Sequence, residues 1–464
     1  MAWPRVKTPP EWGVRPVPPE ERKLGTLDIA VLWSSLGVGL LVLAAGSLLV
    51  NLHGLSLAEV ILVSAAGSVV GSLMLAAAAR HGSLHGVPTM VSLRPILGRR
   101  GSALPSALNA LQLLGWAAFE LLVMGLAASA LLRPTNLPLT ASVLIPVAGL
   151  LVLGLAWLGP LRVVRMWLER FAFWIMLATT VLIALSLAAQ PRDLWARYNS
   201  RSFEGLASLL LALDLVIVMP ISWWPLVADY NRFARSAKAS TLGTAVGFSS
   251  ANTSFYVLGA GLSIYVWANP LVGFAGWGDP LGALLQLSIG SVVVLIILAD
   301  ETDNAFANVY STAVSVQNVA PRWRQFRLLL LATAAATAAA LLLDARNEGL
   351  GGGYELFLIA IGGIFVPLLG VVVADSFVVR RAGYRPEEFA DAAPLWQPGA
   401  LVAWAAGTLL YFAVNREWFP EFPPVGATLP AFALAAAVHL ILSRPTRLRS
   451  ASTEGPAPPP PPPA

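Results

Sequence analysis

Long apolar stretches recur from one end of the chain to the other, and only short polar segments separate them. Most of the stretches approach the roughly 20 residues that an α-helix needs to cross the hydrocarbon core of a bilayer. The first half predicts spans at 28–50, 57–79, 104–132, 139–158, 171–189 and 206–227. The second half predicts spans at 242–268, 290–314, 328–343, 354–379, 401–414 and 429–442. The pattern therefore predicts an all-α membrane protein with 12 transmembrane helices.

The composition does not fit a soluble globular protein. Apolar residues make up 57% of the chain and charged residues only 12%, about half the usual share of charged residues, and the mean hydropathy is +0.71. The absence of cysteine excludes disulfides and thiolate metal sites. The net charge of +5 is spread over short connections instead of one basic face, so no nucleic-acid partner is expected.

The lysines and arginines indicate the orientation of the spans. If both termini are cytoplasmic, 24 of the 30 lie on the cytoplasmic side, and the exceptions are Arg133, Arg192, Arg197, Arg201, Arg346 and Arg416. Basic residues concentrate in cytoplasmic loops, so we expect an even number of spans in the plasma (inner) membrane, with both ends inside. The proline-rich tails at 1–26 and 445–464 are predicted to be disordered.

Two of the predicted spans carry residues that interrupt helices. The first span contains a row of small residues, Ser34, Ser35, Gly37 and Gly39. The sixth contains Pro220 and Pro225, each of which removes a backbone donor and favours a kink, although small residues and kinks also serve ordinary helix packing. Interrupted helices at positions one and six are typical of an inverted repeat of five plus five helices, with the substrate site at the repeat interface. We therefore predict a ten-helix transport core at 27–380 and two additional transmembrane helices at 381–444.

Glu120 lies deep in the third span. It follows Trp116 by four residues, so both side chains share one face of the helix. A carboxylate at the centre of a bilayer costs at least about 2.5 kcal/mol and therefore asks for a partner or a role. A ring can stack on the tryptophan while the carboxyl oxygens accept hydrogen bonds from its N–H groups. The pair favours a planar heterocycle as ligand, and the alternative is an interhelical hydrogen bond.

The eighth span carries the densest polar cluster of the chain. Five polar residues follow one another there, Asp300, Glu301, Thr302, Asp303 and Asn304. Asn308 lies one turn further on. Hard oxygen ligands inside a membrane suit a cation such as sodium, or a transferable proton. The alternative is that the span ends at Ala299 and the cluster forms a loop.

Several short motifs stand out against the apolar background. They are Gly86-Val87-Pro88, the stretch Arg94-Pro-Ile-Leu-Gly-Arg-Arg-Gly-Ser, Gly115-Trp116, Ala228-Asp229-Tyr230-Asn231-Arg232-Phe233, and Asp303-Asn304 with Tyr310. Together they resemble the nucleobase-cation-symport family, which includes cytosine permeases and transporters of hydantoin, allantoin and hydroxymethylpyrimidine. The resemblance runs from residue 27 to residue 444. It implies a leucine-transporter-type fold with a 5+5 inverted repeat plus two C-terminal helices.

The resemblance also implies a substrate site and a cation site. The substrate-binding candidates are Trp116, Glu120, Ser222, Trp223, Asn304 and Asn308. The cation ligands are the carbonyls of Ser35, Val38 and Ala299 and the side chains of Thr302 and Asp303. A glutamine is common in the family where Glu120 stands, and a hydroxyl or amide is usual where Asp303 stands. The coupling cation is therefore expected to be sodium, or a proton at Asp303, and no cofactor is expected.

These features predict secondary active transport and not catalysis. We expect symport of a planar nucleobase or related pyrimidine, namely cytosine, a purine or hydroxymethylpyrimidine. The alternative is an amino-acid or amine transporter of the same fold. An intramembrane enzyme is not supported, because none of the four histidines stands with a carboxylate pair and a nucleophile inside the bundle. The expected partners are the small planar heterocycle and the lipid bilayer, and the chain is expected to be monomeric.

Overall fold

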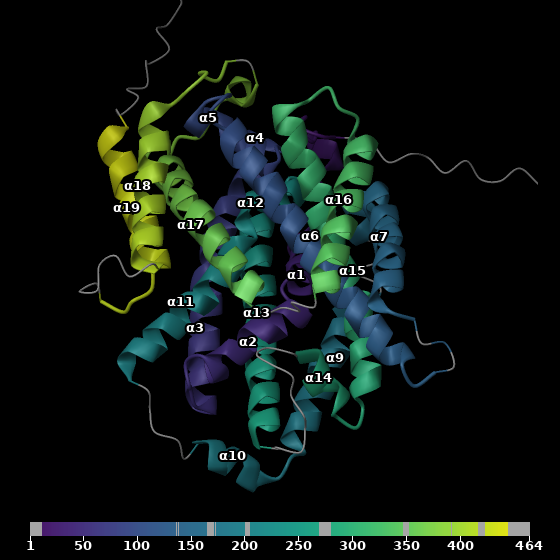
Figure 1. Cartoon of the computed structure of the whole chain (residues 1–464). Helices are drawn as coiled ribbons and strands as arrows, with labels where there is room; N and C mark the ends of the chain where they lie inside the picture. Colours follow the sequence, from purple (N-terminus) through teal and green to yellow (C-terminus); the bar gives the residue numbers. More distant parts are fainter. Residues whose placement is uncertain are drawn as a thin grey trace, which may run out of the picture.

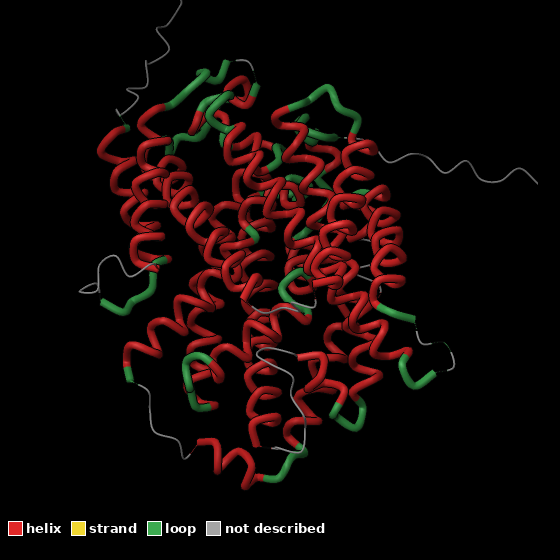
Figure 2. The backbone as a smooth tube through the Cα atoms, viewed as in Figure 1, coloured by secondary structure: helices red, strands yellow, loops and turns green. Residues whose placement is uncertain are grey.

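The computed structural model describes residues 12–135, 137, 139–164, 171, 173–199, 205–268, 280–346, 352–390, 392–415 and 423–443. These residues form helices joined by turns and loops, and within them Leu24 and Ala234 make a single isolated β-bridge (Figures 1 and 2). The predicted tail at 445–464 and the first eleven residues of the tail at 1–26 lie outside the described residues.

Each predicted span coincides with a helix or a pair of helices. The first half contains α1 (Thr26–Ser35) with α2 (Leu40–Asn51), α3 (Leu57–His85), α6 (Ala103–Leu132), α7 (Ala141–Leu158), α9 (Phe173–Ala188), and α11 (Leu206–Ser222) with α12 (Trp224–Asn231). The second half contains α13 (Ala237–Ala268), α15 (Gly290–Val319), α16 (Gln325–Arg346), α17 (Gly352–Ala374), α18 (Pro398–Asn415) and α19 (Thr428–Leu442). Shorter helices lie in the connections, including α4 (Thr89–Ser92), α5 (Arg94–Leu97), α8 (Pro160–Val163), α10 (Arg192–Asn199) and α14 (Pro280–Leu285).

The lengths and hydropathies of these helices are those of a multi-span membrane protein. Among the described residues, seven helices are long and apolar enough to cross a membrane, or eight if the bent pair α1 and α2 is one span. The helices α9 and α19 are apolar but shorter, with 16 and 15 residues, whereas α13 and α15 have 32 and 30 residues and are more polar. Large side chains such as Leu150 and Ile441 are exposed on the outside of the bundle, where lipid can cover them.

The first span is broken as predicted. The axes of α1 and α2 differ by 66° across the four residues between Ser35 and Leu40. Gly39 within this break has a φ of 142°, a backbone conformation that glycine adopts without steric cost. The two halves of the first span therefore point in different directions.

The sixth span is interrupted more mildly than predicted. Only Trp223 separates α11 from α12, and the 26 residues from α11 to α12 qualify together as one span without a bend above 40°. Trp223 keeps a helical conformation because its N–H reaches the Pro220 carbonyl at 3.2 Å. The Met219 carbonyl that this shift leaves free accepts a hydrogen bond from Ser222 Oγ at 2.7 Å. Local hydrogen bonds therefore keep Trp223 helical and satisfy the Met219 carbonyl.

The polar cluster of the eighth span is part of a helix. The helix α15 runs through it without interruption, and all residues from 300 to 315 are buried, so the loop alternative is wrong. This helix packs along α6 and α7, while α13 packs along α1, α2 and α3 (Figure 1). The acids of α15 therefore lie inside the bundle, beside the broken first span and α6.

The segment that precedes α1 packs against the bundle, contrary to the predicted disorder of 1–26. Val17 is fully buried, and its N–H donates to the Gly86 carbonyl at 2.8 Å. Arg232 donates from its guanidinium to the Gly13 carbonyl at 2.7 Å. Buried arginine and backbone groups supply hydrogen bonds that the composition of the segment does not reveal.

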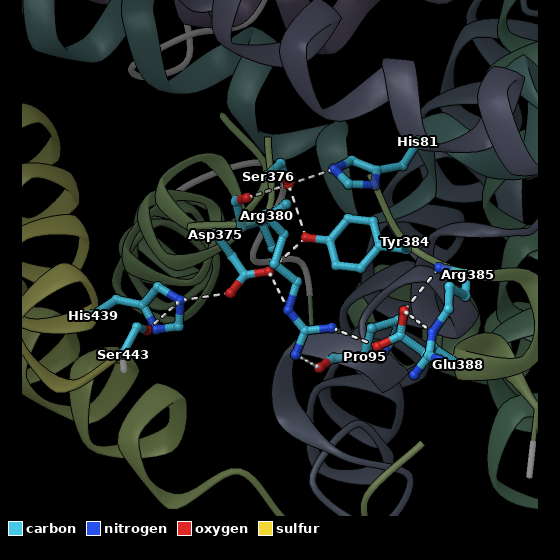
Figure 3. Close-up of polar contacts among 11 residues, drawn as sticks. His81, Pro95, Asp375, Ser376, Arg380, Tyr384, Arg385, Glu388, His439 and Ser443 are labelled. Atoms are coloured by element: carbon cyan, nitrogen blue, oxygen red, sulfur yellow. Dashed lines mark hydrogen bonds and ion pairs between the residues drawn. The ribbon is translucent and has the colours of Figure 1, made fainter. Parts of the chain in front are cut away.

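A polar network anchors the C-terminal helices to the core (Figure 3). Asp375, which follows α17, accepts a hydrogen bond from the Tyr384 hydroxyl at 2.6 Å and lies 2.9 Å from His439 Nε2 of α19. Ser376 beside it lies 2.6 Å from His81 Nε2 of α3. Burial raises the pKa of Tyr384, and the charge of Asp375 raises it further. One carboxylate therefore joins α17, α19 and the connection between them.

Candidate functional site

Two side chains of α15 bind the backbone at the break in the first span. Glu301 accepts a hydrogen bond from the Leu40 N–H, and Asn304 Nδ2 donates to the Val38 carbonyl at 2.8 Å. Backbone groups freed inside a membrane need such partners because no bulk water reaches them. A Cβ on Gly39 would lie 2.8 Å from Glu301 Oε1. Glycine is thus required here both by its backbone conformation and by the closeness of Glu301.

Glu120 of α6 and Glu301 of α15 are neighbours, and their carboxyl groups interact electrostatically. Glu120 is 3% exposed and Glu301 is 0% exposed. Because an ionised carboxylate can only accept hydrogen bonds, a direct bond between the two would need a proton on one of them. The sequence predicts the deep position of Glu120 but not its partner. The signal for the partner was the cost of a lone acid inside the membrane, which calls for a second polar group nearby.

Asp303, a predicted cation ligand, meets the side chain of Ser35, whose carbonyl was the predicted ligand, where α1 ends beside α15. Ser35 Oγ donates a hydrogen bond to Asp303 Oδ2, and Asp300 Oδ1 lies 3.5 Å from the same hydroxyl. The three side chains are buried. Their oxygen atoms form a cluster next to the break, and clusters of this kind bind sodium or carry a proton.

The other predicted cation ligands bind groups of this chain. Thr302 Oγ1 donates to the Ala299 carbonyl at 2.7 Å, and the Val38 carbonyl accepts from Asn304. The Val38 carbonyl keeps a second lone pair that a cation can use, whereas the Ala299 carbonyl also belongs to the hydrogen-bond ladder of α15. In the described part of the chain, no group of three or more His, Cys, Asp or Glu side chains is arranged to hold a metal ion. A sodium ion here would therefore rely on carbonyl and hydroxyl oxygens beside Asp303.

The side chains around the break leave several acceptors without partners. The buried oxygens that lack a hydrogen-bond partner include Glu120 Oε2, Glu301 Oε2, Asp303 Oδ1 and Asn304 Oδ1. Buried polar atoms in folded proteins nearly always have partners, so each exception asks for an explanation. All four of these atoms belong to the residues that surround the break in the first span.

An aromatic wall borders Glu120. Trp116 packs edge-on against Tyr354 and Phe357 of α17, with ring centroids 6.0 and 5.3 Å apart. A Cβ on Gly115 would lie 2.5 Å from the Phe357 ring, which explains why glycine precedes the tryptophan. The Tyr354 hydroxyl is buried without a hydrogen-bond partner. Sequence reasoning missed Tyr354 and Phe357, because their span carried no polar signal.

The remaining predicted substrate residues occupy other places. Trp223 packs edge-on against Trp33 of α1 at 6.2 Å, and Ser222 donates to a carbonyl of its own helix. Within the described residues, no ring contact or hydrogen bond joins either of them to Trp116. Asn308 is buried on α15, one turn beyond Asn304.

The motifs that are far apart in sequence assemble on the side of the bundle where the N-terminal segment packs. Asp229 Oδ1 accepts from the Thr89 N–H at 2.9 Å, and Thr89 Oγ1 in turn accepts from the Ala228 N–H at 2.9 Å. Arg232 donates to the Tyr310 hydroxyl at 2.9 Å. These bonds join the region after α3 to α12 and α15.

Comparison with known proteins connects this arrangement to a family. Residues 16–432 match the family described as permeases for cytosine/purines, uracil, thiamine and allantoin. The chain is 24% identical over 400 residues to the purine-uracil permease of Arabidopsis thaliana, which covers 79% of this chain and 64% of that protein. It is 24% identical over 388 residues to the hydantoin permease of Microbacterium maritypicum, with coverages of 78% and 74%. It is 26% identical over 382 residues to the cytosine permease of Escherichia coli, with coverages of 79% and 80%.

Solved structures share the fold. A nucleobase-cation-symport transporter in a closed conformation, with bromovinylhydantoin bound, has a TM-score of 0.70 at 18% identity and covers 93% of this chain and 95% of that one. A sodium-coupled sialic acid symporter in its substrate-bound outward-open state has a TM-score of 0.57 at 16% identity, with coverages of 90% and 98%. The predicted leucine-transporter-like helical fold is therefore confirmed. The chain belongs to the nucleobase-cation-symport family of permeases, whose members are cation-coupled membrane transporters and not enzymes.

Proposed function

We propose that this permease takes up cytosine, a purine or hydroxymethylpyrimidine by symport with sodium or protons. The observation that carries the proposal is the position of Glu120, one turn after Trp116 and beside Glu301, whose carboxyl binds the break in the first span. A ring stacked on Trp116 would present its N–H groups to that carboxyl. Substrate sites of this kind of fold lie at broken helices near the bilayer midplane.

The coupling cation, in this proposal, binds where α1 ends beside α15. The proposed ligands are the carbonyls of Ser35, Val38 and Ala299 and the side chains of Thr302 and Asp303. The contact of Ser35 with Asp303 supports sodium binding by oxygen atoms, or protonation of Asp303. Both the cation and the substrate would contact residues that hydrogen-bond the backbone between α1 and α2. Binding of either would therefore favour particular relative orientations of these two helices.

The proposed topology has twelve transmembrane helices, with both termini in the cytoplasm and the protein in the plasma (inner) membrane as a monomer. Residues 27–380 form the transport core, and 381–444 contribute two more helices. The coincidence of every predicted span with a helix and the distribution of basic residues support this arrangement. Cysteines introduced singly into this cysteine-free chain, near residues 133 and 385, would test it by labelling from outside and inside intact cells.

A second candidate function is the transport of an amine by the same fold. Amino-acid transporters of this architecture place the substrate carboxylate at the N-terminus of a half-helix. In this chain Glu301 already binds the Leu40 N–H at the start of α2, so a substrate carboxylate would meet a side-chain carboxyl there. That observation disfavours amino acids but leaves positively charged amines as substrates.

Uptake into liposomes that contain the purified protein tests the proposal. Labelled cytosine, hypoxanthine and hydroxymethylpyrimidine would be offered under an inward sodium gradient or an inward proton gradient. We expect saturable uptake of at least one of them, strengthened by one gradient and lost in Trp116→Ala. Trp157→Ala, on the outer face of α7 and 39% exposed, is the matched control and should transport normally. Transport of amines but of no planar base would contradict the proposal.

A further inference from the structure

The region around the break in the first span concentrates carboxyl groups. Four carboxyl groups gather there, and the charges of three of them act on Glu120, namely those of Asp300, Glu301 and Asp303. None of the four forms an ion pair with a basic side chain in the described part of the chain. Acids that are buried inside a membrane protein without a basic partner mark a place where a positive ligand passes or binds.

The unpartnered atoms of this region are mostly acceptors, and the Tyr354 hydroxyl can donate as well as accept. Glu120, Glu301, Asp303 and Asn304 each leave one buried oxygen without a hydrogen-bond partner, and each residue is at least nine-tenths buried. The amide nitrogen of Asn304, which could serve an acceptor on a ligand, already donates to the Val38 carbonyl. A ligand that presents carbonyl oxygens would place acceptors against these unpartnered acceptors. A ligand that presents N–H groups would donate hydrogen bonds to them.

The backbone and the aromatic wall point to the same chemistry. The start of α2, which would otherwise attract an anion, is occupied by Glu301. Trp116 and Tyr354 stand edge-on to each other beside Glu120, and aromatic rings attract cations over their faces. Neither feature provides a place for a negatively charged group.

We infer that the substrate is a planar amino-heterocycle that carries a positive charge, and that Glu120 and Glu301 are the residues that select it. This inference rests on the proposed function and narrows it from planar bases in general to cationic ones. The amino group and ring N–H would bind the free oxygens of the two glutamates, and the ring would lie against Trp116. Neutral rings that present mainly carbonyl oxygens, such as uracil and hydantoin, would bind poorly.

Three probes of nearly the same shape separate charge from hydrogen bonding. The first is para-aminopyridine methylated on its ring nitrogen, which is always cationic and carries an amino group. The second, para-toluidine, has the amino group but no charge at neutral pH. The third, para-picoline methylated on its ring nitrogen, has the charge but no donor. We expect the first to compete with substrate uptake in liposomes about 10- to 100-fold more strongly than either of the others. Equal or stronger competition by para-toluidine would overturn the inference.

Variants of the two glutamates test their assigned role. Glu120→Gln and Glu301→Gln should each weaken competition by the first probe about tenfold or more, while changing competition by para-toluidine little. Glu59→Gln, in the capping box at the start of α3, removes an acid far from the site in sequence. It should leave competition by the first probe and by para-toluidine unchanged. Thermal unfolding in detergent would show whether the variants fold. If they do not, the order in which the three probes compete on the unaltered protein still tests the inference. Uptake of neutral bases with no preference for the cation would refute this inference alone, whereas no uptake of any ring would refute the proposed function as well.

Discussion

Glu120 and Glu301 are neighbours whose carboxyl groups interact, although they lie on different helices and 181 positions apart in the sequence. The second of them also binds the N–H that starts α2. One side chain therefore connects the face of α6 that carries Trp116 to the break in the first span. A ligand that binds Glu120 would change the surroundings of the break directly.

The first prediction concerns Glu301 as the link between these elements. Glu301→Ala would leave the Leu40 N–H and Glu120 without their partners inside the membrane. We expect uptake to fall by about tenfold or more, because unpaired buried polar groups are costly. Initial rates in liposomes, corrected for the amount of folded protein, would measure it. Rates like those of the unaltered protein would show that the link is dispensable.

Gly39 supports a second prediction. Gly39→Ala would place a Cβ 2.8 Å from Glu301 Oε1 and force alanine into a φ of 142°. We expect a loss of about 1–3 kcal/mol of stability, seen as a lower melting temperature in detergent, together with reduced uptake. The control is Gly154→Ala on α7, where a Cβ would meet nothing within 4 Å. That variant should be as stable as the original or slightly more so; equal behaviour of the two variants would contradict this reading of the break.

The sequence predicts the large features because they depend on local composition. Apolar length reveals the spans, and Gly39 near the centre of the first span reveals its break. Glu301 as the partner of Glu120 was not foreseeable, because the contact depends on how α6 and α15 pack. The mildness of the interruption at Trp223 was also missed. The prolines predict a kink, but they do not predict the local hydrogen bonds that keep this segment helical. The side-chain partners thus depend on tertiary contacts, which the hydrophobic pattern of the sequence does not specify.

A third prediction separates two neighbouring serines. Ser35 Oγ donates to Asp303 in the proposed cation site, whereas Ser34 Oγ donates to the Gly247 carbonyl at 3.2 Å. Ser35→Ala removes a hydroxyl that stabilises the ionised carboxyl of Asp303. With sodium as the coupling cation, the sodium concentration needed for half-maximal uptake should rise about tenfold; with protons, the proton concentration needed should fall. Ser34→Ala should leave that concentration nearly unchanged. Titration of uptake with sodium, and separately with protons, would measure both, and equal shifts in the two variants would count against the site.

The network around Asp375 gives a prediction about stability. Asp375→Asn would weaken the hydrogen bond from Tyr384, which holds the connection after α17, and the contact with His439, which holds α19 to the core (Figure 3). We expect about 1–3 kcal/mol of destabilisation, read as a lower melting temperature in detergent. Substrate specificity should not change, because the network lies outside the proposed site. An altered preference among the bases would show that the C-terminal helices influence substrate recognition.

The most direct test of the account is gradient-driven uptake of labelled hydroxymethylpyrimidine, an aminated ring, by liposomes containing either the unaltered protein or Glu120→Gln. The account predicts saturable, gradient-dependent uptake by the unaltered protein and at least about a tenfold lower affinity in the variant. Uptake that is absent from the unaltered protein for this and every other planar heterocycle, or identical affinity in the two proteins, would contradict the assignment of Glu120 as the group that reads the ring.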